Sequence, residues 1–146
     1  MGWPGRSKAV RTPPPDPPPA LSEGKSARAS STWGPGYEAD KAFDGDESTR
    51  WGAAPNSRSG WLEVDLGKET RIGRAVIMEL GYHRTQEFII EFKQGDVWKE
   101  LRRGTTIAGP RVFDFPPLTA RYVRLNILKA SEVPTIEEFQ IFGPTK

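Results

Sequence analysis

Short runs of β-branched and aromatic residues recur along the chain from residue 25 onward. Seven such runs cover residues 61–66, 74–80, 87–93, 97–101, 112–115, 122–128 and 136–142. Within the run 122–128, three apolar residues alternate with Arg124 and Asn126, as expected for a strand with one buried face. Only residues 37–43 look helical, for about one turn. Many short strands separated by Gly and Pro, without long helices between them, predict an all-β, antiparallel sandwich of seven or eight strands.

Residues 1–24 differ in composition from the rest of the chain. They hold seven of its 14 prolines, most of them in a nearly unbroken run at 13–19. Such a run favours the polyproline II helix and cannot build a core. We therefore expect a linker or leader over residues 1–24, with a proline-motif ligand as the alternative, and one folded module over residues 25–146.

Composition limits the kinds of function. The chain has 146 residues, enough for one domain with its own core. It has no cysteine, which excludes disulfides, thiolate metal sites and a cysteine nucleophile. Its 21 basic and 19 acidic residues are spread along the chain without a basic stripe, so nucleic acid is not an expected partner. No apolar run is long enough to span a membrane, and the N-terminus lacks the apolar segment of a signal peptide.

An acidic loop precedes the first strong strand. Asp44 and Asp46 flank a glycine, and Thr49 adds a hydroxyl and a carbonyl nearby. Hard oxygen ligands of this kind are those that calcium prefers. An ordinary acidic turn is the alternative for Asp-Gly-Asp alone, but the tryptophans on both sides, Trp51 and Trp61, favour a structural cation. We expect these two rings to pack beneath the loop.

Four motifs together resemble a known family. They read Lys-Ala-Phe-Asp-Gly-Asp-x-x-Thr-x-Trp at 41–51, Trp-Leu-Glu-Val-Asp-Leu-Gly at 61–67, Ala-Arg-Tyr-Val-Arg-Leu at 120–125 and Ile-Glu-Glu-Phe-Gln-Ile-Phe at 136–142. Over residues 26–142 the chain is similar to discoidin or coagulation-factor type C domains, in the branch called family 32 carbohydrate-binding modules. The later half is most similar to modules appended to bacterial α-L-fucosidases.

The resemblance implies a jelly-roll β-sandwich of about eight strands, with a calcium ion near one end and ligand loops at an edge. The calcium ligands that it implies are the Lys41 carbonyl, the Asp44 carboxylate, the Asp46 carbonyl, Thr49 through carbonyl and hydroxyl, and Glu138. A carboxylate from the last strand would join the two ends of the chain through one ion.

Strand register selects Glu138 rather than Glu137 as that carboxylate. Ile136 and Glu138 would point to one side of the last strand, whereas Glu137 and Phe139 would point to the other. Phe139 is apolar and takes the core face, so Glu138 turns away from the core.

Two aromatic residues of one loop, Trp33 and Tyr37, are candidates for sugar binding. An aromatic face suits the apolar side of a sugar ring, and polar groups suit its hydroxyls. Trp33 lies among two glycines and a proline, where an exposed ring suits a ligand, although it would equally pack back against the end of the sandwich. For Tyr37 the alternative is that the short helix predicted to start there buries its ring.

Polar candidates for the same role lie in two further loops. Tyr82, His83 and Arg84 place a phenol, an imidazole and a guanidinium between two strong strands. Related sugar-binding modules often use a histidine and an arginine against vicinal hydroxyls, although a lone loop histidine is usually just solvated. Arg58, in a polar loop after the cation motif, is the remaining candidate. The identity of the sugar stays open.

These patterns favour binding over catalysis. Asp44 and Asp46 fit the cation role. Glu137 and Glu138 face opposite ways on a strand, and His83 has no nucleophile motif to serve, so we expect no enzymatic activity in this chain. We expect a secreted, monomeric carbohydrate-binding module with a structural calcium, which holds an appended glycoside hydrolase near its oligo- or polysaccharide. The alternative is a discoidin-type domain that binds a protein or a phospholipid surface, although a membrane would require more apolar spikes than this sequence offers.

Overall fold

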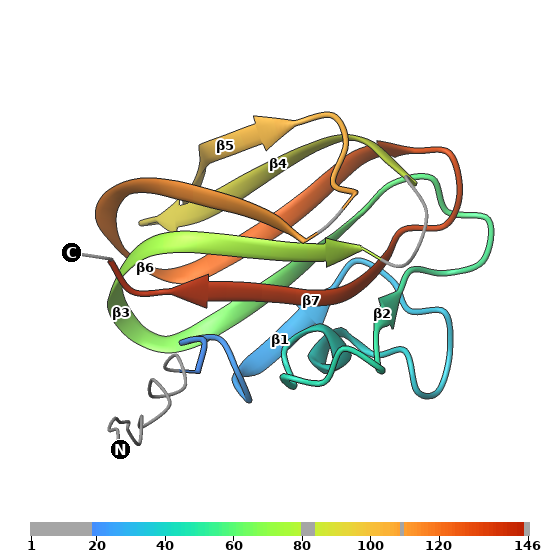
Figure 1. Ribbon diagram of the computed structural model, residues 1–146, viewed down its shortest axis with the longest axis horizontal. Helices are drawn as coiled ribbons and strands as arrows, with labels where there is room; N and C mark the ends of the chain where they lie inside the picture. The colour runs from blue at the N-terminus through green and yellow to red at the C-terminus, as the bar shows by residue number, and fades with distance from the viewer. Residues whose placement is uncertain (1–18, 80–83, 109, 145–146) are drawn as a thin grey trace, which may run out of the picture.

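The computed structural model describes residues 19–79, 84–108 and 110–144. Within these residues it has seven strands and one short 3-10 helix. In chain order they are β1 (Ser26–Ala29), η1 (Ala39–Ala42), β2 (Trp51–Gly52), β3 (Gly60–Glu79), β4 (Thr85–Gln94), β5 (Val97–Gly104), β6 (Arg111–Ala130) and β7 (Thr135–Phe142). All strand pairs are antiparallel, which confirms the predicted all-β fold (Figure 1).

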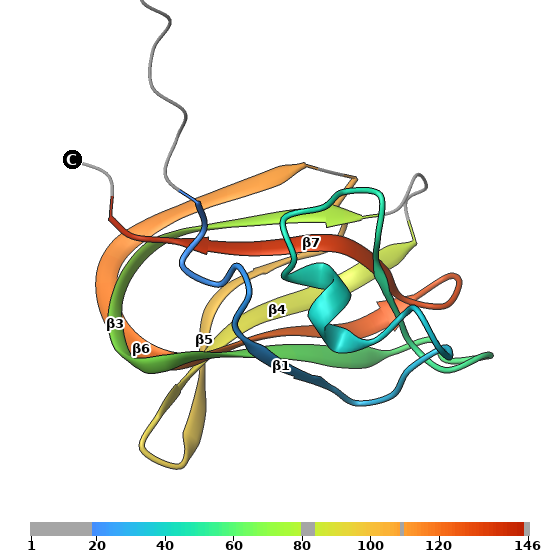
Figure 2. The same cartoon turned by 90° about the horizontal axis from the view of Figure 1, so that it is seen from below.

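Two strands of 20 residues, β3 and β6, bend around the molecule and take part in both layers of the sandwich (Figure 2). Their ladder shifts register between Asp65 and Thr70 and again between Ile72 and Arg74. Such irregularities allow a strand to bend sharply. Gly67 lies in the first irregular segment with a φ of 94°, which L side chains rarely adopt. Four of the predicted runs are therefore halves of two long strands.

The sheet has the strand order β2-β7-β3-β6-β4-β5, with β1 beside β3. The first half of β3 pairs with β1 and with the second half of β6, whereas its second half pairs with β7 and with the first half of β6. The bend places these two groups of strands face to face. Apolar side chains from both layers fill the space between them, among them Leu62, Val64, Ala75, Ile77, Leu125, Ile127, Phe139 and Ile141.

An irregularity in β7 changes the expected alternation of its side chains. Glu138 lies opposite Met78, whereas Ile136 lies opposite Glu79, so Glu137 is an extra residue on this strand. The extra residue shifts the in-and-out alternation of side chains by one position, so that Ile136 and Glu138 face opposite sides of the strand. The expectation that Ile136 shares the face of Glu138 is therefore wrong, and Ile136 is fully buried in the core.

The outer face of the sheet carries a stack of aromatic and cationic side chains. The guanidinium carbon of Arg124 lies 4.1 Å from the ring centroid of Trp61 and 4.1 Å from that of Trp98. Arg124 also donates from Nη2 to Glu63 Oε1 over 2.7 Å, and Glu63 is only 4% exposed. The prediction that the Trp61 ring packs beneath the acidic loop is wrong, since the ring packs against Arg124 on the outer face of the sheet. Trp51 is fully buried, and its Nε1 donates to the Ser31 carbonyl.

The first and last described segments lie side by side. The Leu21 N–H donates to the Ile141 carbonyl over 2.7 Å, and the Ile141 N–H donates to Ser22 Oγ over 2.9 Å. Figures 1 and 2 place the end of β7 and the segment beside it at the end of the sandwich away from the turn between β6 and β7. In the described part of the chain, no helix is long enough and apolar enough to cross a membrane.

Candidate functional site

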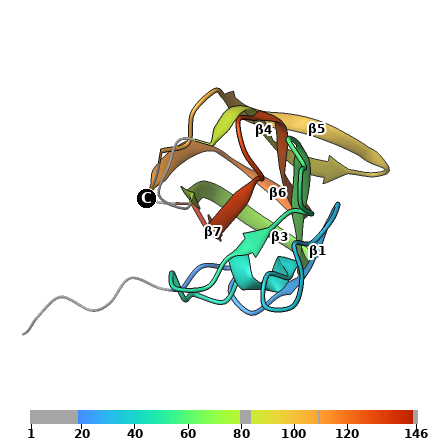
Figure 3. The same ribbon diagram turned by 90° about the vertical axis from the view of Figure 1, so that its right-hand side faces the viewer.

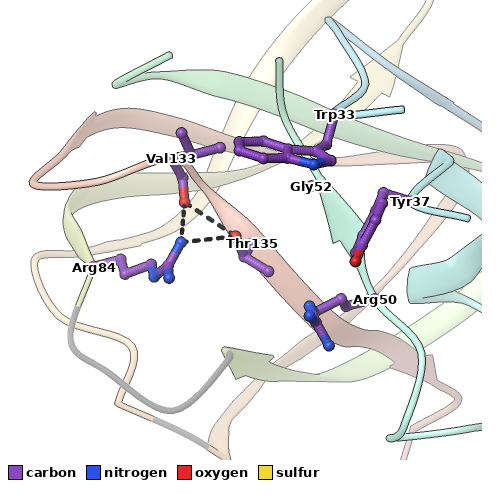
Figure 4. A pocket seen from close by; sticks show the side chains of 7 residues that line it. All are labelled: Trp33, Tyr37, Arg50, Gly52, Arg84, Val133 and Thr135. Carbon is purple, nitrogen blue, oxygen red and sulfur yellow. Dashed lines mark hydrogen bonds between the residues drawn. The ribbon is translucent and has the colours of Figure 1, made fainter. Parts of the chain in front are cut away.

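The loops at one end of the sandwich, which faces the viewer in Figure 3, surround a shallow hollow of about 190 Å³. We call it the loop-end hollow. The described residues that line it are Trp33, Tyr37, Arg50, Gly52, Arg84, Val133 and Thr135 (Figure 4). They come from four separate segments of the chain, so the hollow exists only in the folded domain.

The backbone of β2 holds the aromatic wall of the hollow. The Trp33 N–H donates to the Gly52 carbonyl over 2.7 Å, and the Gly52 N–H donates to the Tyr37 carbonyl over 3.2 Å. A Cβ atom at position 52 would lie 3.3 Å from the Trp33 Cβ, which is tight for such contacts. Glycine at this position therefore lets the loop approach β2 closely and fixes both aromatic residues. The Trp33 side chain remains about half exposed, at 49%.

Arg84 is held rigidly on the opposite side. Its Nη1 donates to the Val133 carbonyl over 2.9 Å and to the Thr135 hydroxyl over 3.1 Å (Figure 4). The following residue, Thr85, donates its N–H over 2.9 Å and its hydroxyl over 2.6 Å to one oxygen of Glu79, which is 6% exposed. This buried clamp fixes the backbone on which Arg84 sits.

Arg50 completes the hollow from the side of β2. Its guanidinium carbon lies 5.4 Å from the centroid of the Tyr37 ring, close enough for a cation–π contact. The two arginines thus present several N–H donors next to the half-exposed indole of Trp33. An apolar face beside hydrogen-bond donors suits a small polar ligand that has one apolar side.

The structure brings three of the six predicted ligand residues together. Trp33, Tyr37 and Arg84 line the loop-end hollow. Arg58 does not; it is exposed and donates from Nη1 to the Ser57 carbonyl over 2.9 Å. Tyr82 and His83 lie outside the described residues.

Sequence reasoning missed Arg50 and Thr135. Arg50 belongs to the cation motif at 41–51, and nothing in that motif indicates that its side chain also lines the hollow. The link between the two residues is the pairing of Gly52 with Thr135 in the β2–β7 ladder. That pairing joins strands more than 80 residues apart, and no local pattern indicates it.

The acidic loop gathers oxygen atoms around the Thr49 hydroxyl. Thr49 Oγ1 lies 2.5 Å from Asp44 Oδ2, 3.0 Å from the Asp46 carbonyl and 3.4 Å from the Lys41 carbonyl. A hydroxyl has one proton to donate, so three acceptors crowd around a single donor. The Asp46 carboxylate is turned away and accepts from Ser48, whose hydrogen bonds lower the pKa of Asp46.

Glu138 reaches the same loop from β7. Its Oε1 accepts from the Gly45 N–H over 3.2 Å, whereas its buried Oε2 has no hydrogen-bond partner among the described residues. Burial first, and the Asp44 carboxyl next, raise the pKa of Glu138 to about 8. The buried Phe43 ring packs 5.9 Å from that of Phe139 and anchors the loop beside this strand.

The oxygen set fits a hard cation better than a transition metal. In the described part of the chain, no three Asp, Glu, His or Cys side chains gather around one point. The loop instead offers two carboxylates, Asp44 and Glu138, together with carbonyl and hydroxyl oxygens. Calcium accepts such mixed oxygen ligands, whereas zinc and copper sites rely on histidine and cysteine.

The fold and the hollow define a β-sandwich module whose loops gather at one end. The family model of the F5/8 type C domain matches residues 26–139. The chain therefore belongs to the F5/8 type C domain family, and the predicted resemblance to this family is confirmed.

Two solved structures illustrate the likeness. Chitosan-binding module 1 of a chitosanase/glucanase from Paenibacillus sp. IK-5 is 29% identical with a TM-score of 0.78, over 85% of this chain and 98% of that chain. A GH29 fucosidase from Ruminococcus gnavus, solved with fucose, is 26% identical with a TM-score of 0.79, over 87% of this chain and 27% of that chain.

One curated relative is also a fucosidase by name. It is "Putative alpha-L-fucosidase 1" of Oryza sativa subsp. japonica, 29% identical over 94 residues, which amount to 62% of this chain. The matched part spans only 18% of that relative's length.

Proposed function

We propose that this domain binds carbohydrate in the loop-end hollow and does not act as a catalyst. The observation that carries the proposal is the half-exposed Trp33 indole, held by β2 beside the donors of Arg84 and Arg50. An indole face packs on the apolar face of a pyranose ring, and guanidinium groups bind its hydroxyls. The chitosan-binding and fucosidase neighbours support the same proposal.

Replacing Trp33 by alanine tests the site. We expect Trp33→Ala to weaken binding to a responsive glycan by about 30-fold or more, because an aromatic anchor contributes about 2 kcal/mol or more. The melting temperature should change little, since the ring is 49% exposed in the free protein. Isothermal titration calorimetry against plant and animal oligosaccharides and a thermal melt measure the two effects.

Val97→Ala is a matched control, because Val97 is 58% exposed and lies outside the loop-end hollow. It should leave the affinity unchanged. Equal glycan binding by wild type and Trp33→Ala would move the site elsewhere. Sedimentation with phospholipid vesicles, combined with no response to any sugar, would favour the membrane alternative.

We further propose a structural calcium in the acidic loop. Asp44, Glu138 and Thr49, with the carbonyls of Lys41 and Asp46, would hold it. Support comes from the surplus of acceptors around the Thr49 hydroxyl and from the unpartnered buried Glu138 oxygen. When bound, calcium supplies the positive charge that these oxygens lack and ties the loop to β7.

In its full setting, we propose a monomeric, secreted module that tethers a glycoside hydrolase to its glycan. The fucosidase relatives are much longer than this chain, which spans 27% and 18% of the two described above. A proline-rich segment at 1–24 suits a semi-rigid spacer. Tethering would raise the local concentration of enzyme at the polymer.

A further inference from the structure

Two guanidinium groups share the loop-end hollow, and no carboxylate is among the described residues that line it. Figure 4 places Arg84 and Arg50 on opposite sides of the hollow, with Thr135 between them. We infer that the ligand of the hollow is an acidic sugar, one that carries a carboxylate or a sulfate group. This inference rests on the proposed function and names its ligand class.

The charge of Arg84 is fixed in place but not neutralised. Its hydrogen bonds run to a carbonyl and a hydroxyl, which are neutral acceptors. Among the described residues, the one carboxylate within 4.0 Å of its nitrogens is that of Glu132, which lies 4.0 Å from Nη2 and is 64% exposed. The buried Glu79 carboxylate binds the next residue, Thr85, and forms no ion pair with Arg84 within 4.0 Å. A pair at this limiting distance whose acidic partner is mostly in water contributes little. The Arg84 side chain itself is only 18% exposed, so protein rather than water surrounds most of it, and its charge is screened less than that of a surface arginine.

Arg50 likewise keeps an available charge. Among the described residues, no carboxylate lies within 4.0 Å of its guanidinium. Burial and the charge of Glu47 raise the pKa of Glu137, and Arg50 acts against that rise without forming an ion pair with Glu137. Glu38, in the loop of Tyr37, accepts instead from a glycine N–H of its own loop over 3.1 Å.

The two charges select between sugars of similar shape. The Arg50 guanidinium can pair with a carboxylate or sulfate through two parallel hydrogen bonds, which are about twice as strong as neutral ones. Nη1 of Arg84 already donates to Val133 and Thr135, so Arg84 adds its charge and the donors of Nη2. An amino sugar would bring a positive charge toward two others. The Paenibacillus neighbour is named for chitosan, a polymer of amino sugars, and we expect this chain to disfavour that ligand.

Calorimetry with four oligosaccharides of equal length tests the inference. They are an oligogalacturonate, a sulfated galactan fragment, a neutral galactan fragment and chitotriose. In wild type we expect at least one acidic ligand to bind about tenfold more tightly than the neutral one, and chitotriose to bind most weakly. Added salt should weaken acidic binding more than neutral binding. The two acidic ligands distinguish carboxylate from sulfate.

A pair of variants assigns the effect to the hollow. Arg50→Gln removes the charge but keeps amide donors that can bind hydroxyls, so it should lower acidic affinity about tenfold and neutral affinity far less. Arg103→Gln, which removes an exposed arginine on β5 that pairs with Glu100, should preserve the preference. Equal affinity of wild type for acidic and neutral ligands, or equal loss in both variants, would overturn the inference and leave the proposed function standing. Failure of every glycan to bind would overturn both.

Discussion

Calcium is expected to raise the melting temperature of the metal-free protein by about 10 °C at saturating concentration. A ligand present at about 100 times its Kd adds about 2.7 kcal/mol to the free energy of unfolding. In a domain of this size, that gain corresponds to roughly 10 °C. The physical reason is that the ion satisfies the crowded oxygens around Thr49 and the buried oxygen of Glu138. Thermal melts in chelator and in calcium measure the shift.

The calcium effect should depend on pH. Burial and the Asp44 carboxyl raise the pKa of Glu138 from its ordinary 4.5 to about 8. Without metal, the stability that this carboxyl contributes is full below about pH 4.5 and is lost as the pH rises through about 8. Calcium binds the ionised form, so the gain in melting temperature should grow from about pH 5 to about pH 8.

Glu138 and its neighbour provide a matched pair of variants. Glu138→Gln should abolish the calcium-dependent shift, whereas Glu137→Gln should retain it, because among the described residues it is Glu138 and not Glu137 that is hydrogen-bonded to the acidic loop. A wild-type melting temperature that is identical in chelator and in calcium would refute the cation proposal.

Replacing Arg124 by alanine should lower the free energy of unfolding by about 3 kcal/mol. Arg124 lies between two indoles and neutralises Glu63, whose side chain is 5% exposed. Removal leaves a buried carboxylate with only Arg28, which is 71% exposed, as its partner. Removing one partner of a buried ion pair typically costs about 3–5 kcal/mol. Because Arg28 still pairs with Glu63 in this variant, we expect the lower value, about 3 kcal/mol. Urea unfolding followed by tryptophan fluorescence measures the loss.

The exposed pair of Arg74 and Asp114 is the control for this variant. Its side chains are 38% and 58% exposed, although their nitrogen and oxygen approach to 2.7 Å. Arg74→Ala should therefore cost less than about 1 kcal/mol. Similar losses in the two variants would mean that the aromatic stack around Arg124 adds no stability.

The fold class could be predicted from the sequence because alternation is a local signal. Arg124 does face away from the core, as its position between apolar residues indicates. The bends in β3 and β6 were not predictable, since a shift of register depends on the partner strand. β1 and β2 have four and two residues, too few to show a pattern.

The loop-end hollow was predictable only in part. Trp33 stands out because a tryptophan in a loop rich in turn residues suggests a ligand, and Arg84 stands out because it follows a phenol and an imidazole between two strong strands. Arg50 and Thr135 carry no such signal, because their place in the hollow follows from the pairing of β2 with β7. The same limit applies to Glu137, whose role as an extra residue depends on the facing strand.

The hydrogen bonds that hold Leu21 and Ser22 against Ile141 bring both ends of the folded unit to one pole. The strands and loops that carry the hollow, among them β2 and the turn before β7, lie at the other pole (Figures 1 and 3). A fluorescent label, a biotin or a fused protein attached beside residue 19 or residue 144 would therefore leave the aromatic rim unobstructed. Immobilised through such a handle, the domain would display its rim outward on a sensor chip.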